Sequence, residues 1–523
     1  MIHSRRAALM VPLFAVPSSQ SWGIGELTDL PRLAAWMREA GLHVLQLLPL
    51  HEMSPGETSP YSSMTAMALD PLYVHVPGVE DFAALGGEAG LDAAAASTLT
   101  AVRASRSVRY AEVRALKMHA LRAAYGRFVT AEIDHRTVRA RAFAQFVETE
   151  AWWLEEYAVF RALHAAFDEQ AWYDWPAPLA AGDPAALAAA RAELAGEIRF
   201  RQYVQWIADG QWATARAACG DIALYGDLTF MVSRDSPDVW ARQDEFRSDA
   251  TVGVPPDAFS ETGQDWGLPP WRHDVMAQGD FAWMRARARR SAALYAGARL
   301  DHLVGLYRTY IRPLDPDAPR VFDPPDEPAQ LALGEYLVGI YCATGAEVIA
   351  EDLGTVPDFV RESLARLDVP GFKVMRWERD WHADGQPFID PAGYPSRAVA
   401  MTGTHDTETL AEWWDEAPAE EREATCRLPS VARVLRDAGA DSPWGPEIRD
   451  ALLEALMHSG ADLVVLPLQD IFGWRDRINV PGTVAETNWT WRLPWTLEEM
   501  ATRPEARERA ATLAAWGRTT GRR

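Results

Sequence analysis

The chain has only three cysteines in 523 residues: Cys219, Cys342 and Cys426. They are far apart, form no CxxC pair and have no His-rich neighbourhood, which argues against a disulfide scaffold and against a structural zinc site. Such sparse use of cysteine is typical of a reducing compartment, so we expect a cytoplasmic protein. No apolar run reaches the about 18 residues of a membrane helix, so we expect no membrane partner.

Basic residues are also few relative to acidic ones. Lys and Arg number 51 against 74 Asp and Glu, which gives a net charge of −23. This balance, without any basic stripe, argues against binding to a phosphate backbone, so we expect no nucleic-acid partner. Hydrophobic residues make up 48% and charged residues 24%, as in ordinary soluble globular proteins. The length suits one large barrel with insertions or three domains.

The N-terminus has two interpretations. Arg5 and Arg6 precede the apolar stretch AALMVPLFAV, an order that resembles the charged and apolar regions of a signal peptide. Pro12, Pro17 and the lack of a small-x-small cleavage pattern favour instead a first strand at Leu9–Val16. Removing this stretch would leave the fold predicted below one strand short.

Eight short apolar runs extend along nearly the whole chain, and each is typical of a strand buried on both faces. Between most of them lie stretches with helical spacing of apolar residues, such as Leu27–Ala40, Leu331–Ala343 and Asp358–Leu367. This alternation implies right-handed parallel crossovers, and eight units would close a (β/α)8 TIM barrel of the α/β class. The eight runs are Leu9–Val16, His43–Leu50, Ile222–Phe230, Arg299–Leu303, Val348–Asp352, Phe372–Trp377, Ala398–Thr402 and Asp462–Leu468.

One gap breaks the alternation. Residues 51–221 separate the second run from the third, and much of this stretch is rich in Ala, Arg, Leu and Glu with a helical period. We predict that residues 1–76 form the first part of the barrel, 77–195 an inserted helical subdomain, and 196–523 the remainder, which begins with a helix at Glu197–Ala217. Two long loops, 249–271 and 471–493, are expected over the C-terminal face, where they would shape a substrate site.

Four of the apolar runs end in a carboxylate: Asp227, Asp301, Glu351 and Asp406. In a parallel barrel the C-terminal strand ends meet at one mouth, where such folds carry their catalytic groups. Two carboxylates that flank a bond are what retaining glycoside chemistry requires. The 22 tryptophans add weak support, because aromatic rings stack on sugars but also fill large cores.

Asp301 shares a strand face with Arg299, because side chains alternate along a strand. The guanidinium would keep this carboxylate ionised and ready to act as a nucleophile. A structural ion pair at the strand end explains the same two residues equally well.

Glu351 follows an apolar strand, where desolvation raises a carboxyl pKa and suits a general acid. It could equally mark the exit of the strand into solvent. Asp352 faces the other way and is expected to act as a hydrogen-bond partner. Asp406 follows His405 and could stabilise positive charge on a sugar ring; a metal pair is an alternative, although no third or fourth ligand is evident.

Several long motifs resemble the amylomaltases, or 4-α-glucanotransferases, which are distant relatives of the α-amylases. The resemblance extends along nearly the whole chain, with the motifs in the family's order. They are WGIGEL (22–27), LQLLPL (45–50), SPYSSMTAMALDPLY (59–73), GDLTFMVSRDSPDVW (226–240), GVPPDAFSETGQDWGLPPW (253–271), RLDHLVGL, AEDLG, GTHD, RINVPGT and NWTWRL (488–493).

The resemblance implies a retaining double displacement on α-1,4-glucan donors, with glucose or maltodextrin as acceptors and without a metal or cofactor. It implies Asp301 as nucleophile, Glu351 as acid and base, and Asp406 as transition-state stabiliser. Tyr61 is similar to the residue that stacks on the reacting glucose. The remaining substrate-binding positions are Ser59, Asp227, Asp257, Gln264, Trp266, Arg299, His302, Asp352, His405, Asn479 and Pro481, of which Asp257 and Pro481 could instead serve loop geometry.

The chain departs from the commoner family pattern at a few positions. Thr229 stands where proline is usual, Asp70 where asparagine is usual, and Thr407-Glu408 where Asn-Asp is usual. None of these changes a catalytic carboxylate, so they bear on acceptor preference. An α-glucan hydrolase on the same fold and an inactive glucan-binding protein are the alternatives to a transferase.

Overall fold

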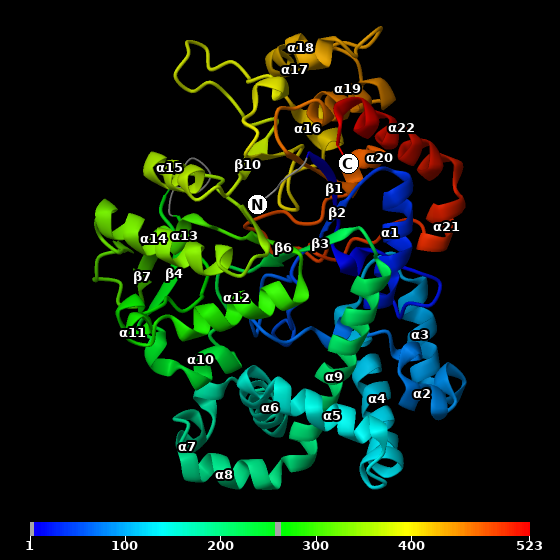
Figure 1. The fold of residues 1–523 in the computed structure, drawn as a ribbon, viewed down its shortest axis with the longest axis vertical. Coiled ribbons are helices and arrows are strands. Elements are labelled where there is room, and N and C mark those ends of the chain that lie inside the picture. Colours follow the sequence, from blue (N-terminus) through cyan, green and yellow to red (C-terminus); the bar gives the residue numbers. More distant parts are fainter. Residues whose placement is uncertain (1–4, 257–262, 523) are drawn as a thin grey trace.

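Eight parallel strands close into a barrel in the computed structural model, which describes residues 5–256 and 263–522 (Figure 1). Around the barrel the order is β1-β12-β11-β10-β9-β6-β3-β2, and β2 closes on β1. The (β/α)8 architecture predicted from the apolar runs is therefore confirmed. The strands are β1 (Arg6–Met10), β2 (Val44–Gln46), β3 (Ala223–Leu228), β6 (Gly297–Leu300), β9 (Glu347–Ala350), β10 (Gly371–Val374), β11 (Ala398–Met401) and β12 (Leu463–Pro467).

Each predicted run overlaps one barrel strand, and two runs are displaced: the fourth, Arg299–Leu303, shares only its first two residues with β6, and the first is shifted further. We expected Leu9–Val16, whereas β1 covers Arg6–Met10 and a 3-10 turn follows at Leu13–Ala15. Pro12 explains the shift, because it has no N–H to donate to a neighbouring strand. Strand β1 pairs with both β12 and β2, so the apolar stretch after Arg6 belongs to the barrel wall.

Helices cover the outside of the barrel. Helix α1 (Leu30–Glu39) lies inside the predicted 27–40 segment, α14 (Glu327–Cys342) begins before the predicted residue 331, and α15 (Asp358–Arg366) agrees within one residue. The others are α10 (Pro237–Ala241), α11 (His273–Gln278), α12 (Ala282–Leu294), α13 (Val304–Tyr307), α16 (Leu410–Glu416), α17 (Ala419–Arg427), α18 (Pro429–Ala432), α19 (Pro446–Met457), α20 (Leu468–Phe472), α21 (Leu497–Thr502) and α22 (Pro504–Thr520). In the described part of the chain, no helix is long and apolar enough to cross a membrane.

The long segment between β2 and β3 is helical, as its composition indicates. Its helices gather in the lower part of Figure 1, and the last of them leads back into the barrel. The division at residues 77 and 195 stays a prediction. These helices are α2 (Glu80–Ala84), α3 (Ala93–Ala104), α4 (Tyr110–Phe128), α5 (Val138–Thr149), α6 (Ala151–Ala166), α7 (Ala177–Ala180), α8 (Pro184–Glu193) and α9 (Ala195–Ala218).

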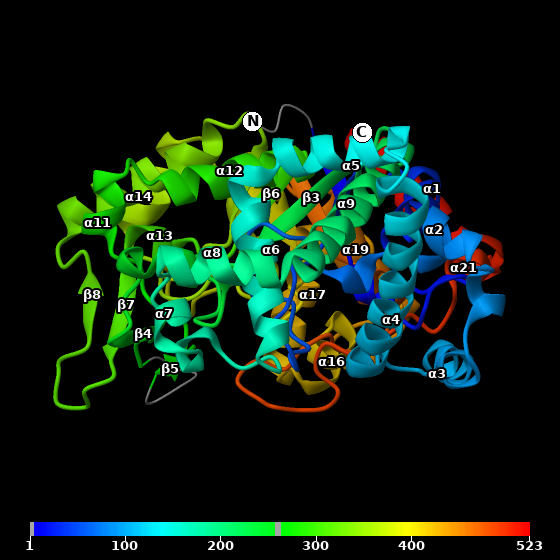
Figure 2. The same ribbon diagram turned by 90° about the horizontal axis from the view of Figure 1, so that it is seen from below.

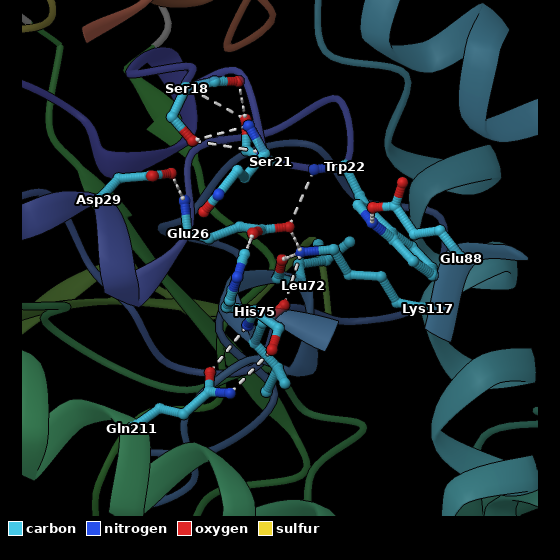
Figure 3. Close-up of polar contacts among 12 residues, drawn as sticks. Ser18, Ser21, Trp22, Glu26, Asp29, Leu72, His75, Glu88, Lys117 and Gln211 are labelled. Carbon is cyan, nitrogen blue, oxygen red and sulfur yellow. Dashed lines mark hydrogen bonds and ion pairs between the residues drawn. The ribbon is translucent and has the colours of Figure 1, made fainter. Parts of the chain in front are cut away.

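A buried ionic cluster fastens helix α4 to the barrel (Figure 3). The Nζ atom of Lys117, on α4, donates to the carbonyls of Leu72 at 2.7 Å and Val74 at 2.8 Å, and lies 2.6 Å from Oε1 of Glu26. The other carboxylate oxygen of Glu26 lies 2.5 Å from Nδ1 of His75. Lys117 and Glu26 are fully buried, so each depends on the other for neutralisation.

A second, antiparallel sheet lies beside the barrel and was not predicted. Its order is β5-β4-β7-β8, with β4 (Ala250–Val254), β5 (Gln264–Asp265), β7 (Thr309–Pro313) and β8 (Val321–Asp323). The segment 249–271, predicted as a loop, therefore supplies two strands. Gly253 is needed there, because a Cβ atom would lie 1.9 Å from the carbonyl oxygen of Gln264.

The two ends of the barrel differ in what covers them. In Figure 2 both termini lie along the upper edge, while strands β4 and β5 and the orange-red loop after β12 lie along the lower edge. The lower edge is the side on which the barrel strands end. This is the face on which strand-end side chains of a (β/α)8 barrel meet.

Candidate active site

The four strand-end carboxylates predicted from the sequence come from β3, β6, β9 and β11. Asp227 lies within β3, Asp301 and Glu351 directly follow β6 and β9, and Asp406 lies five residues after the end of β11. The strand ladders continue past the strand ends: the N–H of Asp301 donates to Leu228 at 3.1 Å, and the N–H of Glu351 donates to Leu300 at 3.1 Å. Neighbouring strand ends therefore bring Asp227, Asp301 and Glu351 to the same mouth.

Arg299 is the charged centre of this group. Its Nη1 atom lies 2.7 Å from Oδ1 of Asp227 and 2.7 Å from Oδ1 of Asp301. Burial alone would lower the pKa of Arg299, but the two carboxylates raise it well above its ordinary value. The guanidinium therefore stays charged and faces both acids. Asp227 sits opposite Arg299 in the ladder between β3 and β6.

Glu351 lies partly buried at the mouth, against backbone donors. One of its carboxylate oxygens accepts the N–H of His302 at 2.8 Å, and the other accepts the N–H of Leu353 at 3.2 Å. Burial raises the pKa of Glu351 to about 7; the charge of Arg299 opposes this rise and that of Asp301 adds to it. At neutral pH a large fraction of this carboxyl group holds a proton, as a general acid requires.

Asp406 has the opposite electrostatic setting. Burial alone would raise its pKa, but the neighbouring His405 and a hydrogen bond from Asn479 hold the pKa at about 2. Nε2 of His405 lies 3.2 Å from Oδ2, and Nδ2 of Asn479 donates to Oδ1 at 2.6 Å. Nη2 of Arg477 donates to the backbone carbonyl of Asp406 at 3.0 Å. The loop after β12 thus fixes both the carboxylate and the backbone of this residue.

Tyr61 joins the two halves of the site. Its hydroxyl donates to Oδ2 of Asp227 at 2.7 Å, and its ring stacks on that of His405 with 4.8 Å between ring centres. Trp489 packs against both rings, at 5.6 Å from Tyr61 and 5.7 Å from His405. These aromatic rings line the mouth beside the acids, although stacking of Tyr61 on a sugar stays a prediction.

The other predicted substrate positions lie in more varied settings. Trp266 follows β5 and meets the ring of His302 edge-on, with 4.7 Å between ring centres, and burial lowers the pKa of His302 to about 4. Gln264 is exposed and accepts the indole N–H of Trp266 at 3.1 Å. Ser59 accepts the N–H of Tyr61 at 3.2 Å, so its hydroxyl shapes that turn.

Three further positions were predicted: Asp352, Pro481 and Asp257. The carboxylate of Asp352 accepts the N–H of Phe372 on β10 at 2.6 Å, which agrees with the expected role of a hydrogen-bond partner. Pro481 is exposed in the loop after β12. Asp257 lies outside the described residues.

Sequence reasoning missed three residues of the site: Arg376, Arg477 and Trp489. Arg477 and Trp489 stand in the quoted motifs RINVPGT and NWTWRL, so the motifs contained the signal. Arg376 follows β10, and no sequence pattern indicated it, because its contacts are with the segment that follows β11. Within the described residues, no group of three or more His, Cys, Asp or Glu side chains is arranged to hold a metal, which leaves the His405–Asp406 pair without further ligands.

Comparison with known proteins decides the family. The family model described as 4-alpha-glucanotransferase matches residues 11–498. The chain belongs to this family. The resemblance seen in the motifs, and the transferase class that it implies, are thereby confirmed.

Two relatives with this name match over 92% of their length. The 4-alpha-glucanotransferase of Thermus thermophilus is 34% identical over 492 residues, covering 90% of this chain and 92% of the relative. That of Chlamydia caviae is 32% identical over 506 residues, covering 94% and 92%.

Solved structures show the same fold. An amylomaltase from Streptococcus agalactiae in complex with acarbose superposes with a TM-score of 0.81 at 25% identity, covering 99% of both chains. An amylomaltase from Corynebacterium glutamicum has a TM-score of 0.82 at 23% identity, covering 98% of this chain and 75% of that one.

Proposed function

We propose that this 4-α-glucanotransferase works by a retaining double displacement with Asp301 as nucleophile, Glu351 as acid and base, and Asp406 as stabiliser. The donors are α-1,4-glucans and the acceptors are glucose or maltodextrins. The observation that carries the assignment is the contrast between two acids at one mouth. The pKa of Glu351 is raised to about 7, whereas that of Asp406 is held at about 2. Two carboxyl groups with opposite protonation tendencies are what an acid and an anionic stabiliser require.

In the first step an Asp301 oxygen attacks the anomeric carbon and the bond to the departing O4 breaks. The proton of Glu351 moves to that O4, which leaves as a hydroxyl, and the donor segment is held as an ester of Asp301. In the second step Glu351, now a carboxylate, takes the proton of the acceptor 4-hydroxyl. The acceptor oxygen then displaces Asp301, and a new α-1,4 bond forms.

The charges around Asp301 suit both steps. Arg299 lies 2.7 Å from Asp301 and stabilises its carboxylate, which must be an anion both before attack and after release. Asp406 would stabilise the positive charge that develops on the sugar ring between the two carboxylate steps. Because its pKa is about 2, Asp406 stays ionised over the working range of the enzyme.

Transfer requires an acceptor to compete with water. The loop after β12 supports this role, because it supplies both Trp489, packed on Tyr61, and Asn479, bonded to Asp406. We infer that this loop covers bound glucan and limits the access of water to the ester. An enzyme lacking that cover would hydrolyse the intermediate.

We also propose a cytoplasmic location. In the described residues, Cys219, Cys342 and Cys426 are free thiols, which supports a reducing compartment.

The test is incubation of the purified protein with maltotriose, with products separated by size over time. We expect glucose together with a ladder of longer maltodextrins and little net gain in reducing ends. Glucose and maltose with rising reducing ends would favour the hydrolase. If neither maltotriose nor a longer maltodextrin is converted, the proposal fails, and binding of maltodextrin without turnover would identify an inactive glucan-binding protein.

A further inference from the structure

The loop that carries His405 and Asp406 is held at both of its ends by one buried guanidinium. Arg376 follows β10 and is 5% exposed. Its Nε and Nη2 atoms donate to the carbonyl of Thr402 at 3.1 and 3.0 Å, at the start of the loop. Nη2 also donates to the carbonyl of Glu408 at 2.8 Å, at the other end.

Glu408 also supplies the counter-charge. Nη1 of Arg376 lies 2.7 Å from Oε1 of Glu408. Glu408 therefore binds the guanidinium twice, through its carboxylate and through its backbone carbonyl. The planar guanidinium presents several N–H groups in a fixed arrangement, which a lysine ammonium cannot reproduce. Arg376 thus fixes the distance between residues 402 and 408.

Asp470 on α20 also connects the two ends of this loop, from the side of the neighbouring strand β12. Its two carboxylate oxygens accept the hydroxyl of Thr402 at 2.5 Å and the N–H of Leu410 at 2.8 Å. Asp470 is 2% exposed. The loop is therefore spanned by two buried groups of opposite charge, one on each neighbouring strand end.

Packing alone does not hold this loop. A small cavity lies behind it, lined by Thr404, His405, Gln469 and Arg477 among others. By contrast, the loop is very close to Arg376: a Cβ atom at Gly403 would lie 2.7 Å from Nη2 of Arg376 and 2.3 Å from Oγ1 of Thr407. The glycine lets the backbone approach the guanidinium, and polar contacts set the position of the loop.

We propose that Arg376, with Glu408 as its partner, is a positioning residue for Asp406 and thereby sets the rate of glycosyl transfer. This inference rests on the proposed role of Asp406 as stabiliser. Arg376 contacts the two ends of the loop and acts on the sugar only through this loop, which carries Asp406 and its neighbour His405. Small displacements of a stabilising carboxylate reduce transition-state binding while leaving the rest of the glucan contacts unchanged.

The test compares Arg376→Lys, Glu408→Gln and Glu408→Ala with the wild type. Arg376→Lys keeps the charge but loses the planar set of three nitrogens that reach Thr402 and Glu408 in one fixed geometry, so we expect kcat to fall about tenfold with KM unchanged. Glu408→Gln keeps an acceptor and should lose less than about threefold, whereas Glu408→Ala should approach Arg376→Lys. The loss should be the same with maltotriose and with maltotriosyl fluoride, because a stabiliser acts on the sugar whatever the leaving group.

Arg522→Lys is the matched control. Arg522 is 2% exposed, against 5% for Arg376, and it also donates to backbone carbonyls, those of Met457, Ser459 and Ala461, just before the start of β12. This is the end of the barrel away from the acids. Both Arg→Lys variants should lower the melting temperature, but only Arg376→Lys should lower kcat at a temperature where both are folded.

Two outcomes overturn the inference in different ways. If Arg376→Lys melts earlier but keeps the wild-type kcat, as Arg522→Lys should, the guanidinium is merely structural. If Asp406→Asn itself keeps full activity, the proposed function fails rather than the positioning. A loss in Arg376→Lys that appears in KM alone also contradicts positioning, because it would reflect weaker substrate binding.

Discussion

Arg299 lies 2.7 Å from Asp301 and at the same distance from Asp227, so one guanidinium nitrogen contacts two carboxylates from neighbouring strands. Arg299 and Asp227 are almost fully buried, whereas the side chain of Asp301 retains 22% of its exposure. The contact between Arg299 and Asp227 is thus closed off inside the barrel, whereas the contact between Arg299 and Asp301 is open towards the mouth. Of the two carboxylates that contact Arg299, only Asp301 is accessible.

Asp301→Asn should lower turnover of maltotriose about a thousandfold or more, because an amide is a poor nucleophile. Binding of glucan should be largely kept, since the amide has the size of the carboxylate. Calorimetric titration with maltodextrin checks binding, and release of glucose checks turnover. Substantial turnover in a preparation free of wild-type enzyme would mean that another residue is the nucleophile.

Glu351→Gln should depend on the leaving group of the donor. With maltotriose the departing O4 needs a proton, so we expect a loss of about a hundredfold to a ten-thousandfold. With maltotriosyl fluoride the leaving group needs no proton, and the formation of the ester should be nearly normal. The assay follows the fluoride released in the first turnover, because the second step still needs Glu351 as base. Equal losses on both donors would remove Glu351 from the role of acid.

The pH dependence of activity follows from the same residue. Glu351 must be protonated in the free enzyme, and its pKa is raised to about 7. The value of kcat/KM for maltotriose should therefore fall as the pH rises through about 7. This alkaline limb should disappear in the first turnover of Glu351→Gln with the fluoride donor. A profile that stays flat to pH 9 would contradict the assignment.

The stability of the folded protein should also depend on pH through the titration of Glu351. The ordinary pKa of a glutamate is 4.5, and the raised value means that the folded state holds this proton more tightly than the unfolded chain. The contribution of Glu351 to stability is thus fully present below pH 4.5 and lost as the pH rises towards about 7. Glu351→Gln should not show this loss. The melting temperature of the variant minus that of the wild type should therefore increase from pH 5 to pH 8. Scanning calorimetry measures both melting temperatures. If this difference in melting temperature is the same at all pH values from 5 to 8, the carboxyl group of Glu351 does not titrate in that range.

Lys117→Met should destabilise the protein without changing the chemistry of the site. It leaves Glu26 buried with the ring of His75 and the N–H of Trp22 as its partners, and breaking such a pair costs about 3 kcal/mol. The double variant Lys117→Met, Glu26→Gln removes both charges and should recover part of this loss. Urea unfolding measures the free energies of unfolding. If the double variant is as unstable as the sum of the single ones, the two charges are not coupled.

Much of the fold was predictable because a parallel barrel strand is buried on both faces and therefore forms a continuous apolar run. All eight runs overlap strands; β1 was misplaced, where Pro12 ended it early, and β6 begins and ends before its predicted run. The antiparallel sheet escaped prediction for the opposite reason. Strand β4 has mixed burial, and it pairs with β7, which lies beyond β6 in the chain.

The sequence by itself determined the barrel, the family and the strand-end acids, because strand order carries each carboxylate to a known end of a known fold. The tertiary structure decided the protonation of those acids and the support around them. The raised pKa of Glu351 and the lowered pKa of Asp406 depend on burial and on partners from other strands and loops. The contacts of Arg376 with Thr402 and Glu408 also join different strand ends. Such contacts depend on distances that only folding sets, so no local pattern of residues could have indicated them.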